Sequence, residues 1–407
     1  MRPGRVPLYF IACGGTGGHL FPGIAVAEKL SEAGARVVLG VSAKDVDRRA
    51  ITSANGPEVW TLERALPSRG SLGRFARSVA TCVISVRDLR RSFLKERPVA
   101  VLGMGGFTSA APVLAGRLAG AKILLHEANA IPGRATRWLS LLAEKVYVFF
   151  PEAAGRIRRS LVEVIGMPVR PQFEPMDKGA CKISFGLSPA KPVLLIVGGS
   201  QGARALNELM RESLPRLVTR FPDLQYLHLT GEADLRSVAE DYRAYGAKAV
   251  TRPFLTEMEW AMGAADVSLS RAGGSSLAEF AAMRLPSILV PYPHAADDHQ
   301  RANVLAFSRG GAAVPLDPSR ANPETLLKSL ATLLEVESVR VAMKQALEAW
   351  HYPRAAEVLA QAMLDMSDPA WRSLSSNGAE AARGGGRVGS DSELLAMALQ
   401  ARAKSVE

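Results

Sequence analysis

An apolar run, a cluster of glycines and a helical pattern open the chain: Val6-Pro7-Leu8-Tyr9-Phe10-Ile11-Ala12-Cys13-Gly14-Gly15-Thr16-Gly17-Gly18-His19-Leu20-Phe21-Pro22. The run from Val6 to Cys13 predicts a buried strand, and Pro22 predicts the opening of a helix that stops near Gly34. A turn without side chains at such a junction exposes backbone N–H groups at the positive end of the helix dipole. The stretch therefore predicts a strand, an anion-binding turn and a helix.

The same alternation of short apolar runs and helical patterns continues along the chain. Strands are expected at 37–41, 99–103, 122–126, 145–150, 192–197, 224–229, 249–252, 266–270 and 287–291. This alternation is typical of parallel sheets with helices on both faces. We expect two such domains, at 1–166 and 192–366, with a proline-punctuated linker at 167–191. The last helices before 366 are candidates for packing back on the first domain, and 367–407 is expected to be a flexible tail.

The composition is that of an ordinary globular protein. Of 407 residues, 48% are hydrophobic and 22% charged, which excludes a disordered, collagenous or coiled-coil chain. Three cysteines are too few for a disulfide framework or a cysteine-based zinc site. We expect neither secretion nor a membrane span, since there is no signal-peptide pattern and no apolar run of about 18 residues. The net charge of +11 favours a polyanionic partner: nucleic acid, an anionic membrane surface or a phosphorylated substrate.

Two further glycine turns follow predicted strands. Gly198-Gly199-Ser200-Gln201-Gly202 fits the G-x-S-x-G pattern of serine hydrolases, with Asp266 and His294 in the chain order of a triad. We favour a phosphate-binding turn in which Ser200 is a hydroxyl donor, because the first half of the chain has an equivalent glycine turn after its first strand. In the turn from Arg271 to Glu279, many groups can donate to phosphate oxygens. Glu279 is placed to accept hydrogen bonds from sugar hydroxyls, or it is a solvated helix carboxylate.

Histidines mark two candidate positions. His19, after the first glycine turn, is a candidate general base or anion-binding donor, and the alternative is a histidine that caps a helix. The segment from His294 to Gln300 gathers possible metal ligands but lacks the His-Glu-x-x-His spacing of a helical metal site. We therefore predict no metal and no cofactor.

A basic amphipathic helix is expected over 71–91. Its apolar positions include Leu72, Phe75 and Val79, and Arg74 and Arg77 lie among them. This pattern suits the surface of an anionic membrane. It equally fits a helix that faces the core and carries arginines on its solvent side. Aromatic residues are only 6% and do not interleave with the basic ones, so the sequence predicts no nucleic-acid partner.

Taken together, the glycine turns and their neighbours resemble the bacterial MurG family. The matching segments occur in order, within residues 6–366, at Gly14 to Gly23, Gly103 to Phe107, His126 to Asn129, Gly198 to Ala203 and Arg271 to Glu279. The resemblance implies a GT-B fold, two Rossmann-like domains around a cleft. It also implies an inverting transfer of GlcNAc from UDP-GlcNAc to the MurNAc 4-hydroxyl of lipid I, which gives lipid II for peptidoglycan synthesis. The enzyme would act peripherally, at the anionic cytoplasmic face of the inner membrane.

The resemblance also assigns site residues. Ser200 and Gln201 would lie at the diphosphate, Leu255 at the uracil, Glu279 at the ribose and Gln300 at the sugar. The nucleotide would be lined by Gly274, Ser275, Ser276, Leu277 and Ala278, and the donor site completed by Thr16, Gly17, Gly18, Asn129 and Arg170. Beyond the resemblance, we predict that His19, in the acceptor-side loop, is the general base, because an inverting transfer needs a base for the acceptor hydroxyl. His299 stands where many relatives have glutamine, and the tail after Ser367 has no counterpart in the family pattern.

Three other functions remain open from the residues. A transferase of the same fold would act on another lipid acceptor, such as diacylglycerol. A serine hydrolase would use Ser200 as its nucleophile. A non-catalytic nucleotide or membrane binder is disfavoured because three phosphate-type turns recur together with Glu279.

Overall fold

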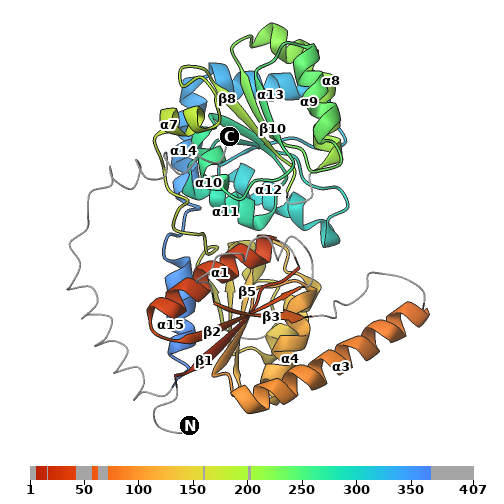
Figure 1. Cartoon of the computed structure of the whole chain (residues 1–407), viewed down its shortest axis with the longest axis vertical. Coiled ribbons are helices and arrows are strands. Elements are labelled where there is room, and N and C mark those ends of the chain that lie inside the picture. Colours follow the sequence, from red (N-terminus) through yellow and green to blue (C-terminus); the bar gives the residue numbers. More distant parts are fainter. Residues whose placement is uncertain are drawn as a thin grey trace, which may run out of the picture.

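Two α/β domains are stacked along the long axis of the molecule (Figure 1). The computed structural model describes residues 6–15, 17–42, 57–62, 72–158, 161–199 and 203–367; of 72–80 it describes only the helical backbone. Each domain is built on one parallel sheet, as the alternating sequence pattern predicts. Within these residues, no helix is both long and apolar enough to cross a membrane.

The N-terminal domain holds a seven-stranded sheet in the order β3-β2-β1-β4-β5-β6-β7. Its strands are β1 (Leu8–Ala12), β2 (Arg36–Ser42), β3 (Glu58–Leu62), β4 (Ala100–Gly103), β5 (Lys122–Glu127), β6 (Lys145–Val148) and β7 (Leu161–Val164). All neighbouring pairs are parallel, with Phe10 of β1 opposite Val38 and Val101. β1 is buried along its whole length, so it forms the centre of this domain.

The C-terminal domain holds a six-stranded parallel sheet in the order β10-β9-β8-β11-β12-β13. Its strands are β8 (Val193–Val197), β9 (Gln225–Leu229), β10 (Ala249–Arg252), β11 (Val267–Ser270), β12 (Ser287–Leu289) and β13 (Val314–Pro315). In both sheets the chain order reverses beside the first strand. Ligands of open parallel sheets bind beyond the carboxyl ends of the strands at such a point.

Helices cover both faces of each sheet (Figure 1). Those between the strands of the N-terminal domain are α1 (Gly17–Glu32), α3 (Leu72–Glu96), α4 (Ala110–Leu118), α5 (Arg134–Leu139) and α6 (Pro151–Ala154). The remaining helices are α7 (Lys178–Ser184), α8 (Arg204–Arg220), α9 (Leu235–Ala244), α10 (Met258–Ala264), α11 (Gly274–Ala282), α12 (His299–Arg309), α13 (Pro323–Glu335), α14 (Glu337–Glu348) and α15 (Ala355–Leu364).

The last helix lies on the first domain. In Figure 1, α15 packs beside α1 of the N-terminal domain, although it follows the C-terminal sheet in the chain. Leu359 and Met363 of α15 are fully buried in the same apolar cluster as Leu20 and Val26 of α1. The N-terminal core is therefore completed by residues more than 300 positions after its first strand.

Some elements differ from those predicted. The prediction that Pro22 opens a helix is wrong, because α1 begins at Gly17 and contains Pro22. Pro22 is the sixth residue of α1, so its missing N–H removes the one backbone hydrogen bond to the carbonyl of Gly18, and the helix continues through it. The continuous helical pattern after residue 324 is divided into α13, α14 and α15. The short strands β3, β7 and β13 were not expected, since they are only partly buried and lie at the edges of the sheets.

Candidate active site

A cleft of about 1690 Å³ lies between the two domains, at the carboxyl ends of both sheets. Its N-terminal wall comes from the turns after β1, β4 and β5, and its C-terminal wall from α11 and the loops after β8, β10 and β12. α1 and α11 both begin at the cleft, at Gly17 and Gly274. Two helix N-termini at one cleft make a strong site for an anion.

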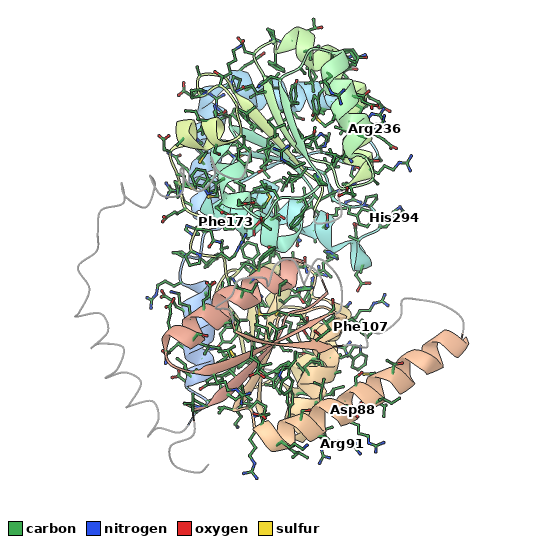
Figure 2. The ribbon with its side chains drawn as sticks, viewed as in Figure 1. Asp88, Arg91, Phe107, Phe173, Arg236 and His294 are labelled. Atoms are coloured by element: carbon green, nitrogen blue, oxygen red, sulfur yellow. The ribbon has the colours of Figure 1, made fainter. Side chains whose placement is uncertain are left out.

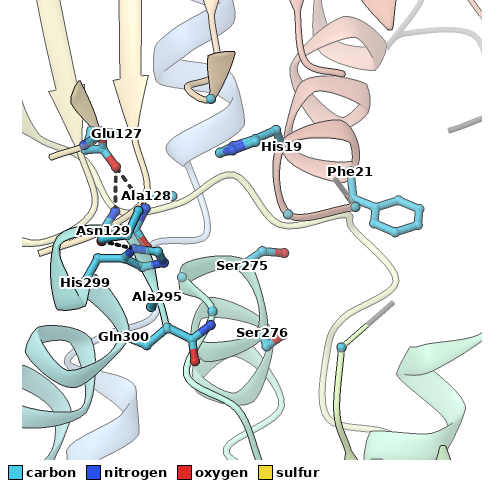
Figure 3. A pocket seen from close by; sticks show the side chains of 18 of the residues that line it. His19, Phe21, Glu127, Ala128, Asn129, Ser275, Ser276, Ala295, His299 and Gln300 are labelled. Carbon is cyan, nitrogen blue, oxygen red and sulfur yellow. Dashed lines mark hydrogen bonds between the residues drawn. The ribbon is translucent and has the colours of Figure 1, made fainter. Parts of the chain in front are cut away.

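His19 sits in the first turn of α1, against the glycine turn that follows β4. A Cβ added at Gly105 would lie 3.2 Å from its Cε1, and one added at Gly106 would lie 3.0 Å from its Nε2. Both glycines have positive φ, so side chains at these positions would be strained as well as crowded. The turn is therefore glycine-rich because the imidazole packs on its backbone. In Figure 3 the ring points from α1 toward the loop after β5.

That loop is organised by the buried carboxylate of Glu127. One oxygen accepts hydrogen bonds from the backbone N–H and the Nδ2 of Asn129, at 3.1 and 3.0 Å, which are dashed in Figure 3. The other accepts from the Gly133 N–H at 3.0 Å and from the Thr136 hydroxyl at 2.6 Å. Four charge-assisted hydrogen bonds hold the loop in one conformation. Glu127 is thus a positioning group, and Asn129 is what it positions.

On the donor side, Gln300 has a fixed orientation. Its Oε1 accepts from the backbone N–H groups of Ala272 at 3.2 Å and Tyr292 at 2.9 Å. Gln300 lines the cleft, and because Oε1 is occupied by these two bonds, its amide NH₂ is the group it can offer to a ligand. Arg271 is buried and donates to the carbonyls of Val290 and Pro291. It therefore supports the loop after β12 from behind.

Arg170 supplies a positive charge to the cleft. Its guanidinium lies 4.3 Å from the ring centroid of Phe21 and 5.0 Å from that of Phe173. Its Nε is buried and has no hydrogen-bond partner among the residues that the structure describes. Stacking on aromatic faces orients the guanidinium and leaves its donors for a phosphate or carboxylate. Burial raises the pKa of Glu279, in α11, to about 7, an effect that Arg170 opposes and Glu259 reinforces.

A buried histidine secures the crossing between the domains. His126 of β5 is fully buried, and its Nε2 lies 2.9 Å from the carbonyl oxygen of Gly166. Burial lowers the pKa of His126 to about 4, so the ring is neutral and Nε2 donates. Gly166 has a φ of +80° and is packed against Tyr352, on the return crossing to α15. His126 therefore serves the domain junction, whereas His19 faces the cleft.

Most of the predicted site residues line this cleft. They are Gly17, Gly18, His19, Asn129, Arg170, Leu255, Gly274, Ser275, Ser276, Glu279 and Gln300. Leu277 and Ala278 are instead buried in the core of the C-terminal domain. Thr16, Ser200 and Gln201 lie outside the described residues, as does the tail from 368. Leu72, Arg74, Phe75, Arg77 and Val79 lie on α3, in the part whose side chains are not described.

The proposed serine triad is not assembled. Asp266 precedes β11, at the amino edge of the sheet, where Lys178 and Lys182 lie 2.8 and 2.9 Å from its carboxylate oxygens. His294 follows β12 and lines the cleft at the opposite edge. Asp297, in the candidate metal-ligand segment, is paired with Arg134 and Arg137. Among the described residues no group of three or more histidine, cysteine, aspartate or glutamate side chains is arranged to hold a metal ion.

Sequence reasoning missed Asn303 and the role of Glu127. Asn303 lies three positions after Gln300, hence on the same face of α12. That spacing is the only sequence signal for it, because its hydrogen-bond partner Ala130 is 173 residues away.

Two Rossmann-like domains whose strand ends and helix N-termini meet at one cleft define the GT-B fold, and the family models below give the class, a glycosyltransferase. Residues 9–148 match the glycosyltransferase family 28 N-terminal domain, and residues 193–359 match its C-terminal domain. Acinetobacter baumannii MurG has the same fold, with a TM-score of 0.69 and 26% identity over 89% of this chain and 100% of that one. The Neisseria meningitidis UDP-GlcNAc 2-epimerase, at 13% identity and a TM-score of 0.63, covers 88% of this chain and 99% of its own. Its likeness is one of fold alone.

Two curated relatives carry the name UDP-N-acetylglucosamine–N-acetylmuramyl-(pentapeptide) pyrophosphoryl-undecaprenol N-acetylglucosamine transferase. The Moorella thermoacetica protein is 37% identical over 375 residues, which is 87% of this chain and 97% of the relative. The Chlorobaculum tepidum protein is 37% identical over 373 residues, 88% of this chain and 98% of the relative. The chain belongs to the MurG family of N-acetylglucosaminyltransferases, as the sequence motifs predict.

Proposed function

We propose that this enzyme transfers GlcNAc from UDP-GlcNAc to the 4-hydroxyl of the MurNAc unit of lipid I, with inversion, to give lipid II. The observation that carries the proposal is the meeting of His19, Arg170 and the N-terminus of α11 at one cleft between the domains. An acceptor base and a diphosphate site are the two components that such a transfer requires. The substrates are those in the names of the relatives.

The residues suggest how the bonds change. His19 takes the proton of the acceptor hydroxyl as its oxygen attacks C1 of GlcNAc from the face opposite the diphosphate. The bond from C1 to the phosphate oxygen breaks, and its electron pair leaves with UDP. Arg170 and the α11 N-terminus stabilise the charge that accumulates on the departing diphosphate. Gln300 donates to the sugar, Glu279 holds the ribose and Leu255 packs on the uracil.

The acceptor carries a long lipid, and we propose that the N-terminal domain meets the anionic cytoplasmic face of the inner membrane. Apolar side chains are exposed beside the cleft on this domain: Val83 of α3 at 61%, Phe107 at 63% and Trp138 at 72%. Figure 2 shows Phe107 on the side from which α3 projects, and Asp88 and Arg91 on α3 itself. Apolar groups near basic ones, such as Arg87 and Arg90, suit peripheral binding to anionic lipid.

Transfer of radiolabelled GlcNAc to a lipid I analogue tests the proposal. Wild-type enzyme should form product in the presence of EDTA, and His19→Ala should lose at least about 100-fold in kcat. His351→Ala is the matched control, since His351 is half-buried beside α14, away from the cleft. Near-normal turnover by His19→Ala would exclude it as the base. Product with diacylglycerol in place of lipid I would identify another acceptor.

Flotation with vesicles tests the membrane surface. Wild-type protein should float with phosphatidylglycerol vesicles at low salt and be released at high salt. Val83→Ser combined with Phe107→Ser should weaken flotation, while UDP binding is retained. Unchanged flotation of this double variant would place the membrane contact elsewhere.

A further inference from the structure

Asn303 is a buried side chain shared by the two domains. It lies on α12 and is 0% exposed. Its Oδ1 accepts a hydrogen bond from the backbone N–H of Ala130, in the N-terminal domain, at 2.9 Å. Its Nδ2 donates to the Oδ1 of Asn129 at 3.1 Å and to the carbonyl of Ala272 at 3.0 Å. Both amide hydrogens and the carbonyl oxygen are therefore in use.

These contacts reach both walls of the cleft. Two side chains of α12 hold the backbone of Ala272. Gln300 accepts a hydrogen bond from the Ala272 N–H, and Asn303 donates one to the Ala272 carbonyl. Ala272 leads directly into the N-terminus of α11. On the other wall, Asn129 is fixed by Glu127. A continuous chain of hydrogen bonds thus runs from Glu127 through Asn129 and Asn303 to Ala272.

A buried amide of this kind favours one domain arrangement. If the domains moved apart by an ångström or so, Asn303 would lose its bonds to Ala130 and Asn129. Buried donors and acceptors that lose their partners are costly, and a hydrogen bond weakens steeply with distance. The close packing of Gly274 on the carbonyl of Ala128 adds a steric stop beside the same contacts.

We propose that Asn303 is a positioning residue that sets the donor-side turn before α11 in register with the acceptor-side loop after β5. It touches neither reacting group, and acts by fixing Ala272 relative to Asn129. This inference rests on the proposed transfer for its catalytic consequence, but the coupling of the two loops can be measured without turnover.

A second contact between the domains provides a matched control. Asp297, beside the N-terminus of α12, pairs with Arg134 at 3.0 Å and also with Arg137, both of α5. Arg134 is 62% exposed, so water and salt screen this ion pair. If any contact between the domains sufficed, Asp297→Asn and Asn303→Asp would have similar effects.

The experiment compares full-length wild type, Asn303→Asp, Asn303→Ser and Asp297→Asn. Asn303→Asp keeps an acceptor for Ala130 but presents an oxygen to two acceptors, so kcat should fall about 30- to 100-fold. The kcat of Asn303→Ser should fall by a smaller factor. UDP affinity, measured by calorimetry, should stay within about threefold, because Leu255 and Glu279 are untouched, and Asp297→Asn should stay within about threefold in kcat.

Deuterium exchange separates loss of coupling from loss of folding. In Asn303→Asp, peptides over 127–133 should exchange faster than in wild type, while peptides over 193–197 in β8 should not change. The proposal is overturned if kcat is unaffected, if exchange rises equally in both regions, or if UDP affinity falls in parallel with kcat without a change at 127–133. Wild type that binds UDP but transfers no GlcNAc would refute the proposed function, and the exchange comparison would still decide the coupling.

Discussion

Gly274→Ala tests the spacing of the two domains most directly. A Cβ at this position would overlap the carbonyl oxygen of Ala128 and lie 3.0 Å from its carbon and 3.2 Å from its Cβ. The tightest contact is with that oxygen, at 2.1 Å, and Cβ atoms essentially never approach another atom closer than 3.0 Å, so α11 and the loop after β5 must separate by about 1 Å. Because the atoms met are backbone, no side-chain rotation can relieve the overlap.

The expected loss follows from that displacement. A shift of this size carries the bond from Ala130 to Asn303 from 2.9 Å to beyond normal hydrogen-bond length. Overpacking of this kind costs about 1–3 kcal/mol in folding stability. Misplacing the donor by about 1 Å costs on the order of 100-fold in kcat/KM, or about 2.7 kcal/mol.

The assay is GlcNAc transfer with purified full-length enzyme, together with thermal melting. Gly155→Ala is the control, because its φ is −67° and a Cβ there would meet no described atom within 4 Å. It should leave kcat/KM unchanged and shift the free energy of unfolding by no more than about 0.5 kcal/mol. If Gly274→Ala keeps kcat/KM within about threefold of wild type, the reasoning that the domain spacing is fixed at this contact is refuted.

Three further predictions concern folding. Gly166→Ala should lower the free energy of unfolding, measured in urea melts, by at least about 2 kcal/mol, since φ is +80° and the new Cβ would overlap Tyr352; adding Tyr352→Ala should not restore the loss, because the overlap includes the Tyr352 Cβ, at 2.2 Å, which that change keeps. Asp266→Asn should destabilise by about 3 kcal/mol without changing kcat, because Lys182 is only 4% exposed and lies at the opposite edge of the sheet from the cleft; a kcat loss larger than the folding loss would reopen a catalytic role for Asp266. Burial raises the pKa of Glu279 from 4.5 to about 7, so its folded form binds more protons, and its contribution to stability is present below about pH 4.5 and lost as the pH rises through 7. The free energy of unfolding of Glu279→Gln should therefore exceed that of wild type by about 2 kcal/mol at pH 8, and the difference should disappear toward pH 4.5. A difference that does not vary with pH would contradict this assignment.

The parts of the fold that local pattern determines were predictable from the sequence. Buried parallel strands such as β1 and β8 are continuous apolar runs, and the glycines that follow them mark the turns at the cleft. Three edge strands, β3, β7 and β13, were missed because their half-exposed positions carry no such run, as in Glu58–Leu62. The start of α1 was misplaced because proline usually marks the first turn of a helix, whereas α1 begins five residues earlier, at Gly17.

At the site, the sequence indicated which residues gather but not how they are held. His19 and Gln300 were predicted from motif and order, and both line the cleft. Positions 105 and 106 are glycine because a Cβ at either would crowd the ring of His19, which belongs to a different segment of the chain. Asn303 bonds to a residue 173 positions away, and the sequence shows His126 only as part of a motif, although its ring supports Gly166. Such partnerships exist only once the sheets have formed.

The position of α15 has a consequence for synthesis on the ribosome. Leu359 and Met363 complete the apolar cluster under α1, so the N-terminal domain is left with an uncovered face until almost the whole described chain has been made. The C-terminal sheet, whose strands lie within 193–315, can fold before that face is covered. Domains of a nascent chain generally fold in order from the N-terminus. Here the first domain to emerge is the last to be finished, and a chain stopped before residue 355 would expose that face to aggregation.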